Sequence, residues 1–255
     1  MVLKGHTNSV HQLCWDPTHP EYLATASADK TVRIWDTRSA KSTHTLKTSG
    51  ANLNIAWSPD GGHIAVGNKL DHLTIIDTRK FETMKTIKFA FEVNEIAWSK
   101  DLTFLFLTTG RGGVEVMSWP SLERTCTLHA HTANCYCVKF SPSGEYFAVG
   151  SADALVSLWD VEDLACLRTF SRLQFPIRTV SFTHDSKMIA SASEDLSIDV
   201  ALVETGELVS QIKCNAAINT MAWHPQNHWL AFAEAEKDKY AKDAGNITLY
   251  QLPSQ

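Results

Sequence analysis

The sequence predicts an all-β fold, a β-propeller of six four-stranded sheets, from a recurring aromatic residue, a fixed order of short strands and regularly placed turns. The aromatic residue ends the first strand of each unit and recurs at intervals of 42, 41, 42, 42 and 41 residues. A period of about 40–45 residues is typical of propeller blades. The six positions are Trp15, Trp57, Trp98, Phe140, Phe182 and Trp223.

Each unit repeats the same elements in the same order. The first strand, as in HQLCW, is followed by a turn such as SPDGG, whose Asp, Pro and Gly suit tight turns. A second strand of small residues, as in YLATAS, suits close packing, and a third strand such as TVRIWD alternates. A weaker fourth strand, such as THTL, closes the unit. We therefore expect a single domain over residues 1–255, with repeats at approximately 5–46, 50–89, 91–128, 131–170, 175–212 and 216–252.

The two ends of the chain carry parts of one unit. VLK lies where a fourth strand is expected, and NITLYQLPSQ is a third strand with nothing after it. We expect Val2–Lys4 to pair as the fourth strand of the last sheet, because such pairing would remove exposed sheet edges.

Composition narrows the class of protein. Hydrophobic residues make up 44% and charged residues 20% of the 255-residue chain, which is ordinary for a globular protein. No apolar stretch approaches the roughly 20 residues that a membrane-spanning helix needs, and the N-terminus lacks a signal-peptide core, so we expect an intracellular protein without a membrane partner. The net charge is −5 and the Lys and Arg residues are scattered, which disfavours tight nucleic-acid binding.

Two units carry a polar pattern that resembles the WD-repeat family. A His precedes the first strand, an Asp lies in the turn after the second, and Trp-Asp ends the third. The resemblance implies a buried hydrogen-bonded chain of the His, a Ser or Thr of the second strand, the turn Asp and the Trp. Thr25 is an alternative hydroxyl in the first unit. The expected chains are His6, Ser27, Asp29 and Trp35 in the first unit, and His131, Ser151, Asp153 and Trp159 in the fourth.

The other four units depart from this pattern. Ile76 and Tyr250 replace the Trp of Trp-Asp, Met117 and Ala201 also take the Trp position, and Leu70 takes the position of the turn Asp. We expect these units to be held mainly by apolar packing and strand pairing.

Longer stretches resemble a narrower family. IAWSPDGGHIAVGN, GSADALVSLWDVEDLACLRTFSRL and FPIRTVSFTHDSKMIASASED are similar to the family of subunit 3 of the THO complex, most specifically over residues 150–195. The resemblance implies a non-catalytic docking subunit of a nuclear assembly that couples transcription and splicing to messenger-RNA export. It further implies binding to the large scaffold subunit and mostly indirect contact with messenger RNA. Many WD-repeat propellers have seven blades, so the six units indicate a form that lacks the first blade.

Partner-binding residues are expected in the loops before the first strands. Seven residues before each marker aromatic, two of the six units carry Phe91 and Phe175, where the others carry small or polar residues. Phe175 lies between Arg172 and Arg178, and an aromatic residue flanked by Arg is typical of interface anchors. The alternative is that each Phe packs between sheets as core.

No motif for catalysis, a cofactor or a metal is recognisable. HExxH, paired-Cys, calcium-loop, GxSxG and phosphate-loop patterns are missing from the sequence. We therefore expect no catalytic, cofactor-binding or metal-ligating residues and no small-molecule substrate. Histidines such as His184 and His228 fall in or beside turns, where solvation is expected. Cys135 and Cys137 are expected as buried thiols on one sheet face.

Two short segments have alternative interpretations. Arg111-Gly112-Gly113 matches one RGG triplet, which is weak evidence for RNA binding because such motifs act in many copies. Glu234–Gly245 is expected as a solvated loop, with partner binding as the alternative.

Two other functions stay open. One is a WD-repeat adaptor in another assembly, spliceosomal or ubiquitin-ligase. The other is a direct single-stranded RNA binder, which the acidic net charge disfavours. No import run of Lys and Arg is evident, so a nuclear location depends on the resemblance.

Overall fold

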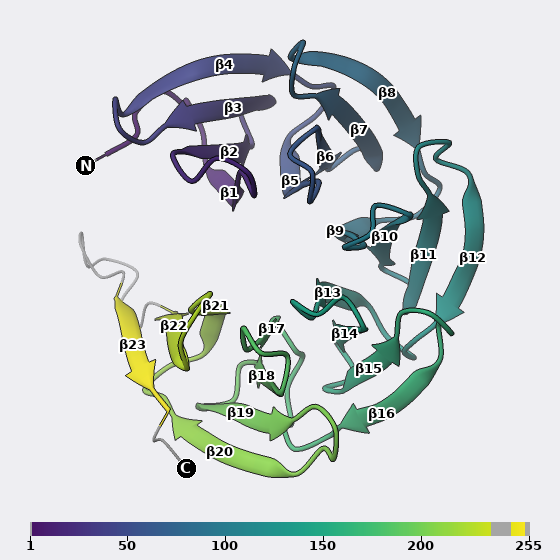
Figure 1. Cartoon of the computed structure of the whole chain (residues 1–255), viewed down its shortest axis with the longest axis vertical. Coiled ribbons are helices and arrows are strands. Elements are labelled where there is room, and N and C mark those ends of the chain that lie inside the picture. The colour runs from purple at the N-terminus through teal and green to yellow at the C-terminus, as the bar shows by residue number, and fades with distance from the viewer. Residues whose placement is uncertain (1, 236–245, 253–255) are drawn as a thin grey trace. The chain divides into compact units, whose positions relative to one another are not determined.

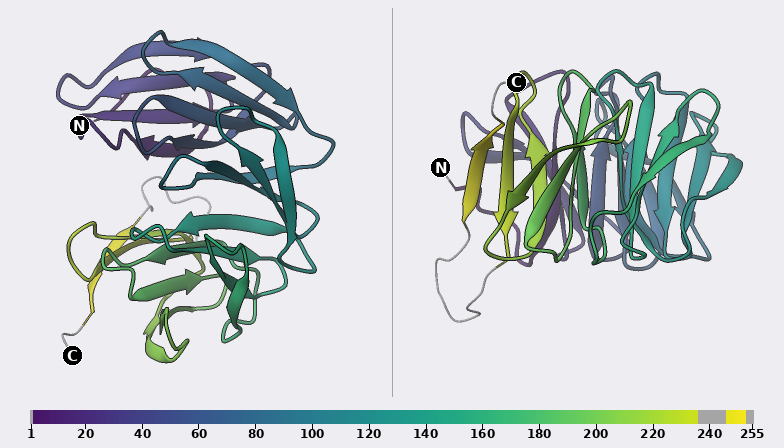
Figure 2. Two further views of the ribbon diagram at one scale, coloured as in Figure 1. Left: turned by 45° about the vertical axis from the view of Figure 1, so that its right-hand side comes forward. Right: turned by 90° about the horizontal axis from the view of Figure 1, so that it is seen from below.

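The computed structural model describes residues 2–235 and 246–252, which form six antiparallel β-sheets and two compact units (Figure 1). The described residues contain no helix, so the all-β prediction is confirmed. No helix of the length and hydropathy needed to cross a membrane occurs among them either. Figure 2 shows the strands of each sheet joined by short turns.

The first unit comprises Met1–Gly110 and Glu115–Thr127 and holds two four-stranded sheets and most of a third. The first sheet contains β1 (Val10–Trp15), β2 (Tyr22–Ser27), β3 (Thr31–Asp36) and β4 (Lys41–Lys47). The second contains β5 (Asn52–Trp57), β6 (His63–Asn68), β7 (His72–Asp77) and β8 (Glu82–Lys88). The third contains β9 (Val93–Trp98), β10 (Phe104–Thr109), β11 (Gly113–Ser118) and β12 (Arg124–His129).

The second unit comprises Arg111–Val114 and Leu128–Gln255. The fourth sheet contains β13 (Cys135–Phe140), β14 (Tyr146–Ser151), β15 (Val156–Asp160) and β16 (Cys166–Phe170). The fifth contains β17 (Thr179–Phe182), β18 (Met188–Ala192), β19 (Ser197–Leu202) and β20 (Leu208–Lys213). The sixth has three strands within the described residues, β21 (Ile218–Trp223), β22 (Trp229–Glu234) and β23 (Ile247–Gln251).

The N-terminal segment lies against the first sheet. Val2–Lys4 adopt no strand, and the sixth sheet ends at β23 among the described residues. Leu3 and Lys4 instead line a hollow with His6 and Trp35, against the face of the first sheet. Because Val2–Lys4 belong to the first unit and the sixth sheet belongs to the second, the expected pairing of the two chain ends stays a prediction.

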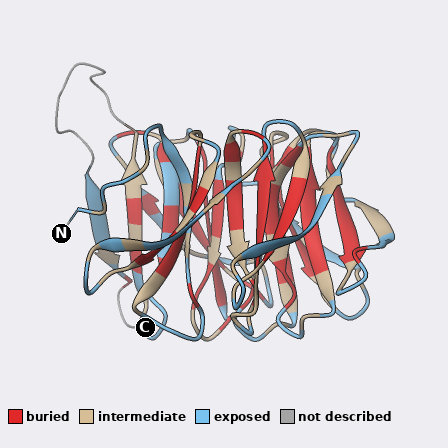
Figure 3. Cartoon of the chain, turned by 90° about the horizontal axis from the view of Figure 1, so that it is seen from above, coloured by how far each residue is buried: buried red, intermediate tan, exposed pale blue. Residues whose placement is uncertain are grey.

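Apolar packing between neighbouring sheets forms the core of each unit. In the first unit, one cluster joins Ile34 of the first sheet to Ile55 and Ile64 of the second, and another cluster continues to the third sheet. In the second unit, two clusters join the fourth sheet to the fifth and the fifth to the sixth. Figure 3 shows that buried residues follow the strands, while the turns are more exposed. A sheet with both faces apolar needs neighbours on both sides, which explains why each unit packs sheet on sheet.

Within each unit, the marker aromatics pack against the sheet that precedes them at Trp57, Trp98, Phe182 and Trp223. Trp98 is buried, and its indole N–H donates to the Ala56 carbonyl of the second sheet at 3.2 Å. Trp15 belongs to the first sheet of its unit and is 53% exposed. The same sequence signal therefore marks a buried side chain in one sheet and an exposed one in another.

A β-bulge recurs at the start of the first strand. In the first, second, third, fourth and sixth sheets the register with the second strand shifts there, as between Cys135 and Cys137. Cys135 pairs with Ser151 and Cys137 with Gly150, two consecutive residues that face opposite sides of the sheet. The prediction that both thiols share a face is therefore wrong, because alternation does not hold across a bulge. Both side chains are buried, and burial raises the pKa of Cys135 to about 12.

In the first sheet, the polar chain uses Thr25 rather than Ser27. Trp35 Nε1 donates to Thr25 Oγ1 at 2.8 Å, His6 Nε2 lies 2.7 Å from the same oxygen, and His6 Nδ1 lies 2.8 Å from Asp29 Oδ2. The Thr25 hydroxyl thus links the Trp35 indole to one nitrogen of the His6 ring, and the other ring nitrogen faces Asp29. Ser27 Oγ instead donates to the carbonyls of the loop before β1.

Asp29 stays ionised although its side chain is buried. Burial by itself would raise its pKa, but hydrogen bonds from Thr31, from His6 and from the backbone N–H groups of Thr7 and Thr31 outweigh it and hold the pKa of Asp29 well below its usual range. The carboxylate therefore ties the loop before β1 to the turn before β3.

In the fourth sheet the hydroxyl comes from a different strand. His131 Nδ1 lies 3.1 Å from Asp153, and His131 Nε2 lies 2.8 Å from Ser157 Oγ, which also accepts the Trp159 indole N–H at 2.7 Å. The predicted Ser151 donates instead to the Ala133 carbonyl.

The register explains this change of strand. Val149 pairs with Ser157 on β15 just as Thr25 pairs with Arg33 on β3. The hydroxyl has moved to the facing strand because the second-strand position is apolar in the fourth sheet.

In the departing units, apolar side chains fill the Trp position. Ile76, Met117 and Ala201 are buried there. At the turn where Leu70 replaces Asp, Asn68 Oδ1 accepts the backbone N–H groups of Leu70 and His72. An amide thus caps a turn that a carboxylate caps elsewhere.

Removal of the Thr25 hydroxyl is expected to destabilise the first sheet. Thr25→Val leaves the buried Trp35 indole N–H without an acceptor, which costs about 1–3 kcal/mol. Urea unfolding measures the loss of unfolding free energy, provided that its dependence on urea concentration (the m-value) is unchanged. Thr25→Ser, which keeps the hydroxyl, is the control.

The double variant Thr25→Val/Arg33→Ser copies the arrangement of the fourth sheet and is expected to recover part of the loss. If the urea unfolding midpoints of Thr25→Val and Thr25→Ser were equal, the hydrogen-bonded chain would contribute nothing to the stability of the first sheet.

Candidate partner-binding surface

Three of the four predicted partner-binding residues lie in one loop of the second unit. Arg172, Phe175 and Arg178 belong to the segment between β16 and β17. Phe91 precedes β9 in the first unit. The two candidate positions therefore differ in surroundings and are considered separately.

Arg172 forms a two-pronged ion pair with a buried carboxylate. Its Nε lies 2.7 Å from Asp199 Oδ1 and its Nη2 lies 2.8 Å from Oδ2, while Asp199 is only 2% exposed. Nη1 donates to the Gly206 carbonyl, and the guanidinium lies over the Phe170 ring at 5.8 Å. These hydrogen bonds to Asp199 raise the pKa of Arg172 above its ordinary value. Arg172 is therefore held in the fold by Asp199, and its contact with a partner stays a prediction.

A second carboxylate holds the middle of the loop. Asp195 Oδ2 accepts the backbone N–H groups of Gln174 at 2.8 Å and Phe175 at 3.2 Å, and the Ser193 hydroxyl at 2.7 Å. Asp29 and Asp153 accept backbone N–H groups at the equivalent point of the first and fourth sheets. The fifth sheet thus keeps the carboxylate that binds the loop backbone. It has a buried Leu173 at the position where the first and fourth sheets have His.

The anchored loop leaves Phe175 on the surface. Its side chain is 49% exposed, whereas Ile177, two residues later, is 1% exposed and belongs to the core. Arg178 pairs with Glu194 at 2.7 Å, and its guanidinium lies 5.1 Å from the centre of the Tyr136 ring. Because both partners of that ion pair are more than two-fifths exposed, the pair is easily exchanged for a partner's charge.

Phe91 has a different environment. It is half-buried and packs against the core cluster between the second and third sheets, with its ring 4.9 Å from that of Phe89. The packing alternative fits Phe91, while the exposed position fits Phe175. Sequence spacing placed both residues at equivalent points and did not separate them.

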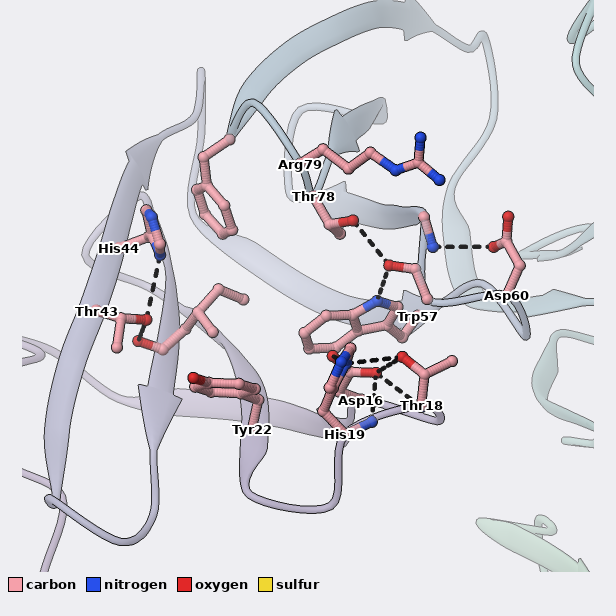
Figure 4. A pocket seen from close by; sticks show the side chains of 14 residues that line it. Asp16, Thr18, His19, Tyr22, Thr43, His44, Trp57, Asp60, Thr78 and Arg79 are labelled. Atoms are coloured by element: carbon pink, nitrogen blue, oxygen red, sulfur yellow. Dashed lines mark hydrogen bonds and ion pairs between the residues drawn. The ribbon is translucent and has the colours of Figure 1, made fainter.

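Sequence reasoning missed a pocket of the first unit. A cavity of about 480 Å³ lies between the first and second sheets, with Tyr22, His44, Trp57 and Phe81 among its walls (Figure 4). The His44 and Phe81 rings stack at 4.2 Å, and the Trp57 indole N–H donates to the Gly61 carbonyl. Its walls come from segments far apart in the chain, so no local motif indicates it.

One corner of this pocket contains Thr18, His19 and Asp16, the residue types of a catalytic triad. His19 Nδ1 lies 2.9 Å from Thr18 Oγ1 and 3.2 Å from Asp16 Oδ2. A triad needs the carboxylate on one ring nitrogen and the nucleophile on the other, whereas both groups here meet the same nitrogen. Thr18 Oγ1 also donates to Asp16 Oδ1 at 2.7 Å. The geometry is that of a capped turn.

The remaining sequence features have structural positions. Arg111-Gly112-Gly113 runs from a turn into β11, and the Gly112 carbonyl accepts the His131 backbone N–H, so the triplet is part of an ordered turn. Within Glu234–Gly245, the segment 236–245 lies outside the described residues. Tyr136, Asp195 and Asp199, which shape the loop around Phe175, carry no signal in the sequence beyond their place in the repeat.

Loss of the Arg172 guanidinium is expected to destabilise the second unit. Arg172→Met leaves the Asp199 carboxylate buried without its partner, and the expected cost is about 3 kcal/mol. Urea unfolding measures it, with Arg38→Met as the matched control. Arg38 pairs with Asp36 in an exposed position, where the expected loss of stability is much smaller than in Arg172→Met. Equal losses in the two variants would contradict the anchoring role.

Comparisons with known proteins agree with the repeat and the sheets. The sequence model of the THOC3 beta-propeller domain matches residues 1–233. THO complex subunit 3 of Arabidopsis thaliana is 56% identical over 255 residues, which is 100% of this chain and 81% of that protein. WD repeat-containing protein AAC3 of Dictyostelium discoideum is 36% identical over 237 residues, 91% of this chain but 49% of that protein. On this evidence the chain belongs to the THOC3 beta-propeller domain family, and its fold is that of a β-propeller.

Proposed function

We propose that this chain is a subunit of the THO complex and acts there as a non-catalytic docking module. The observation that carries the proposal is the 56% identity to THO complex subunit 3, which extends over the whole of this chain. WD repeat-containing protein 26 homolog of Arabidopsis thaliana also aligns with 98% of the chain, but at 25% identity. The difference in identity favours the THO assembly over another WD-repeat assembly.

The structure supports docking through an ordered surface. Asp195 and Asp199 both hold the loop around Phe175, so the backbone that carries the exposed ring is already ordered before a partner binds. Rigid presentation lowers the entropy cost of association. An exposed aromatic ring beside Arg178 has the composition of an interface anchor.

The chemistry of the surface favours a protein partner over RNA. The net charge of the chain is −5, whereas RNA binding gains most of its affinity from clustered positive charge. We propose that the partner is the large scaffold subunit of the THO complex and that messenger RNA is contacted mostly indirectly. The role in messenger-RNA export and the nuclear location belong to the same proposal.

Affinity purification tests the assignment. The tagged full chain, expressed in cells of its source and recovered at low salt, is expected to bring down the large THO subunits, identified by mass spectrometry. Recovery of spliceosomal or ubiquitin-ligase subunits in their place would contradict the THO assignment.

A double variant tests the surface. Phe175→Ser/Arg178→Glu is expected to reduce recovery of the large scaffold subunit at least tenfold, because it removes an exposed ring and reverses an adjacent charge. The thermal melt is expected to stay within about 2 °C, because both side chains are largely outside the core.

The control for this test is Leu167→Ser, which removes a similarly exposed apolar residue from β16. Undiminished recovery with the Phe175→Ser/Arg178→Glu variant would remove this loop from the interface. An equal reduction with Leu167→Ser would show that the effect is not specific to the loop.

A further inference from the structure

Two turns of the second unit bring together residues that are far apart in the sequence. His184 and Asp185 lie in the turn between β17 and β18, and His228 lies directly before β22. The fifth and sixth sheets pack on each other through a shared apolar cluster, so these turns are neighbours. The three side chains form a group that no sequence motif connects.

The three potential ligand atoms lie close together. One ring nitrogen of each His and one Asp185 oxygen all lie within 4.8 Å of one another. His228 Nε2 lies 3.3 Å from Asp185 Oδ2, and the two imidazole ring centres are 4.9 Å apart. In a tetrahedral zinc site with bonds of about 2.0–2.2 Å, neighbouring ligand atoms are about 3.3–3.6 Å apart. The His228–Asp185 pair already has this spacing, and the remaining ligand atoms lie within 4.8 Å.

Hydrogen bonds orient the Asp185 carboxylate toward His228. Asp185 Oδ1 accepts the Thr183 hydroxyl at 2.7 Å and the Lys187 backbone N–H at 3.2 Å, which leaves Oδ2 toward His228. Groups that hydrogen-bond a ligating carboxylate orient it for the metal.

One ring nitrogen of His184, Nδ1, is buried without a hydrogen-bond partner among the described residues. A buried polar atom without a partner is costly, which makes an added ligand favourable. The side chains of His228 and Asp185 are 42% and 25% exposed, so an ion and a water molecule have access from solvent.

Comparison along the repeat shows that the group is specific to this turn. Two residues after the marker aromatic, the other sheets carry no imidazole. They carry Pro17, Pro59, Lys100, Pro142 and Pro225. The imidazole of His184 is therefore not required by the turn itself, since proline or lysine serves that position elsewhere.

We propose that His184, Asp185 and His228 bind one Zn²⁺ ion, with water completing the coordination. Two imidazole nitrogens and a carboxylate are donors that zinc accepts, whereas Ca²⁺ and Mg²⁺ prefer all-oxygen sites. The ion links the turn of the fifth sheet to the turn of the sixth. Zinc thereby stabilises the contact between these two sheets in the folded state.

Isothermal titration of the full, reduced chain with ZnCl₂ at pH 7.5 tests the site. We expect one saturable ion per chain, and His184→Asn and His228→Asn are each expected to weaken binding at least tenfold. His129→Asn, the same change at an exposed histidine of β12, is the matched control and is expected to bind like the parent chain. Thermal melts in EDTA show whether each variant folds, and added zinc is expected to raise the melting temperature only of the parent chain and the control.

Co²⁺ as a spectroscopic probe identifies the donor atoms, because the chain also has six cysteines. Visible bands without a thiolate-to-metal charge-transfer band are expected, and these bands are expected to vanish in His228→Asn. A thiolate band, no saturable binding, or equal zinc affinity in all three variants would overturn the proposal.

Discussion

In five of the six sheets a buried polar side chain lies on the second or third strand at the level of the hydrogen-bonded chains, and each such group needs a partner: Thr25, Thr74, Glu115, Ser157 and Asp199. In the first sheet the partner set is Thr25 with His6, and in the fourth sheet it is Ser157 with His131. In the fifth sheet Asp199 takes the strand position of Ser157, and Arg172 replaces the imidazole. One structural requirement is thus met by three chemistries, since a buried polar group left alone costs more than any of them.

This requirement also shapes the surface on which the proposed function depends. An Arg–Asp pair at the base of the loop and the Asp195 carboxylate at its centre hold the loop backbone, and Phe175 is exposed on this loop. Phe91, at the equivalent point of the third sheet, packs on the apolar cluster beside it. The pocket beside Trp57 arises from packing as well, and its polar groups are turned toward one another rather than arranged for chemistry.

Much of the fold was predictable because it follows from local repetition. The period of the marker aromatics and the strand order after each of them were sufficient for six sheets. The β-bulge before five of the six markers was not predictable, and it overturned the expected common face of Cys135 and Cys137. The serines chosen as chain members were wrong for a related reason, because the sequence lists hydroxyls but does not show which strand faces the imidazole.

The sequence by itself determined the class of fold, the number of sheets and the family, since these depend on periodic residues whose signal is contained within each repeat. The tertiary structure decided which equivalent side chains are exposed, which hydroxyl completes each chain, and that His184 and His228 meet. These outcomes depend on contacts between neighbouring strands of one sheet, or between neighbouring sheets whose residues are about one repeat apart in the sequence. The physical reason is that burial and hydrogen bonding are properties of neighbours in space, and a repeat specifies those neighbours only after it has folded against the next one.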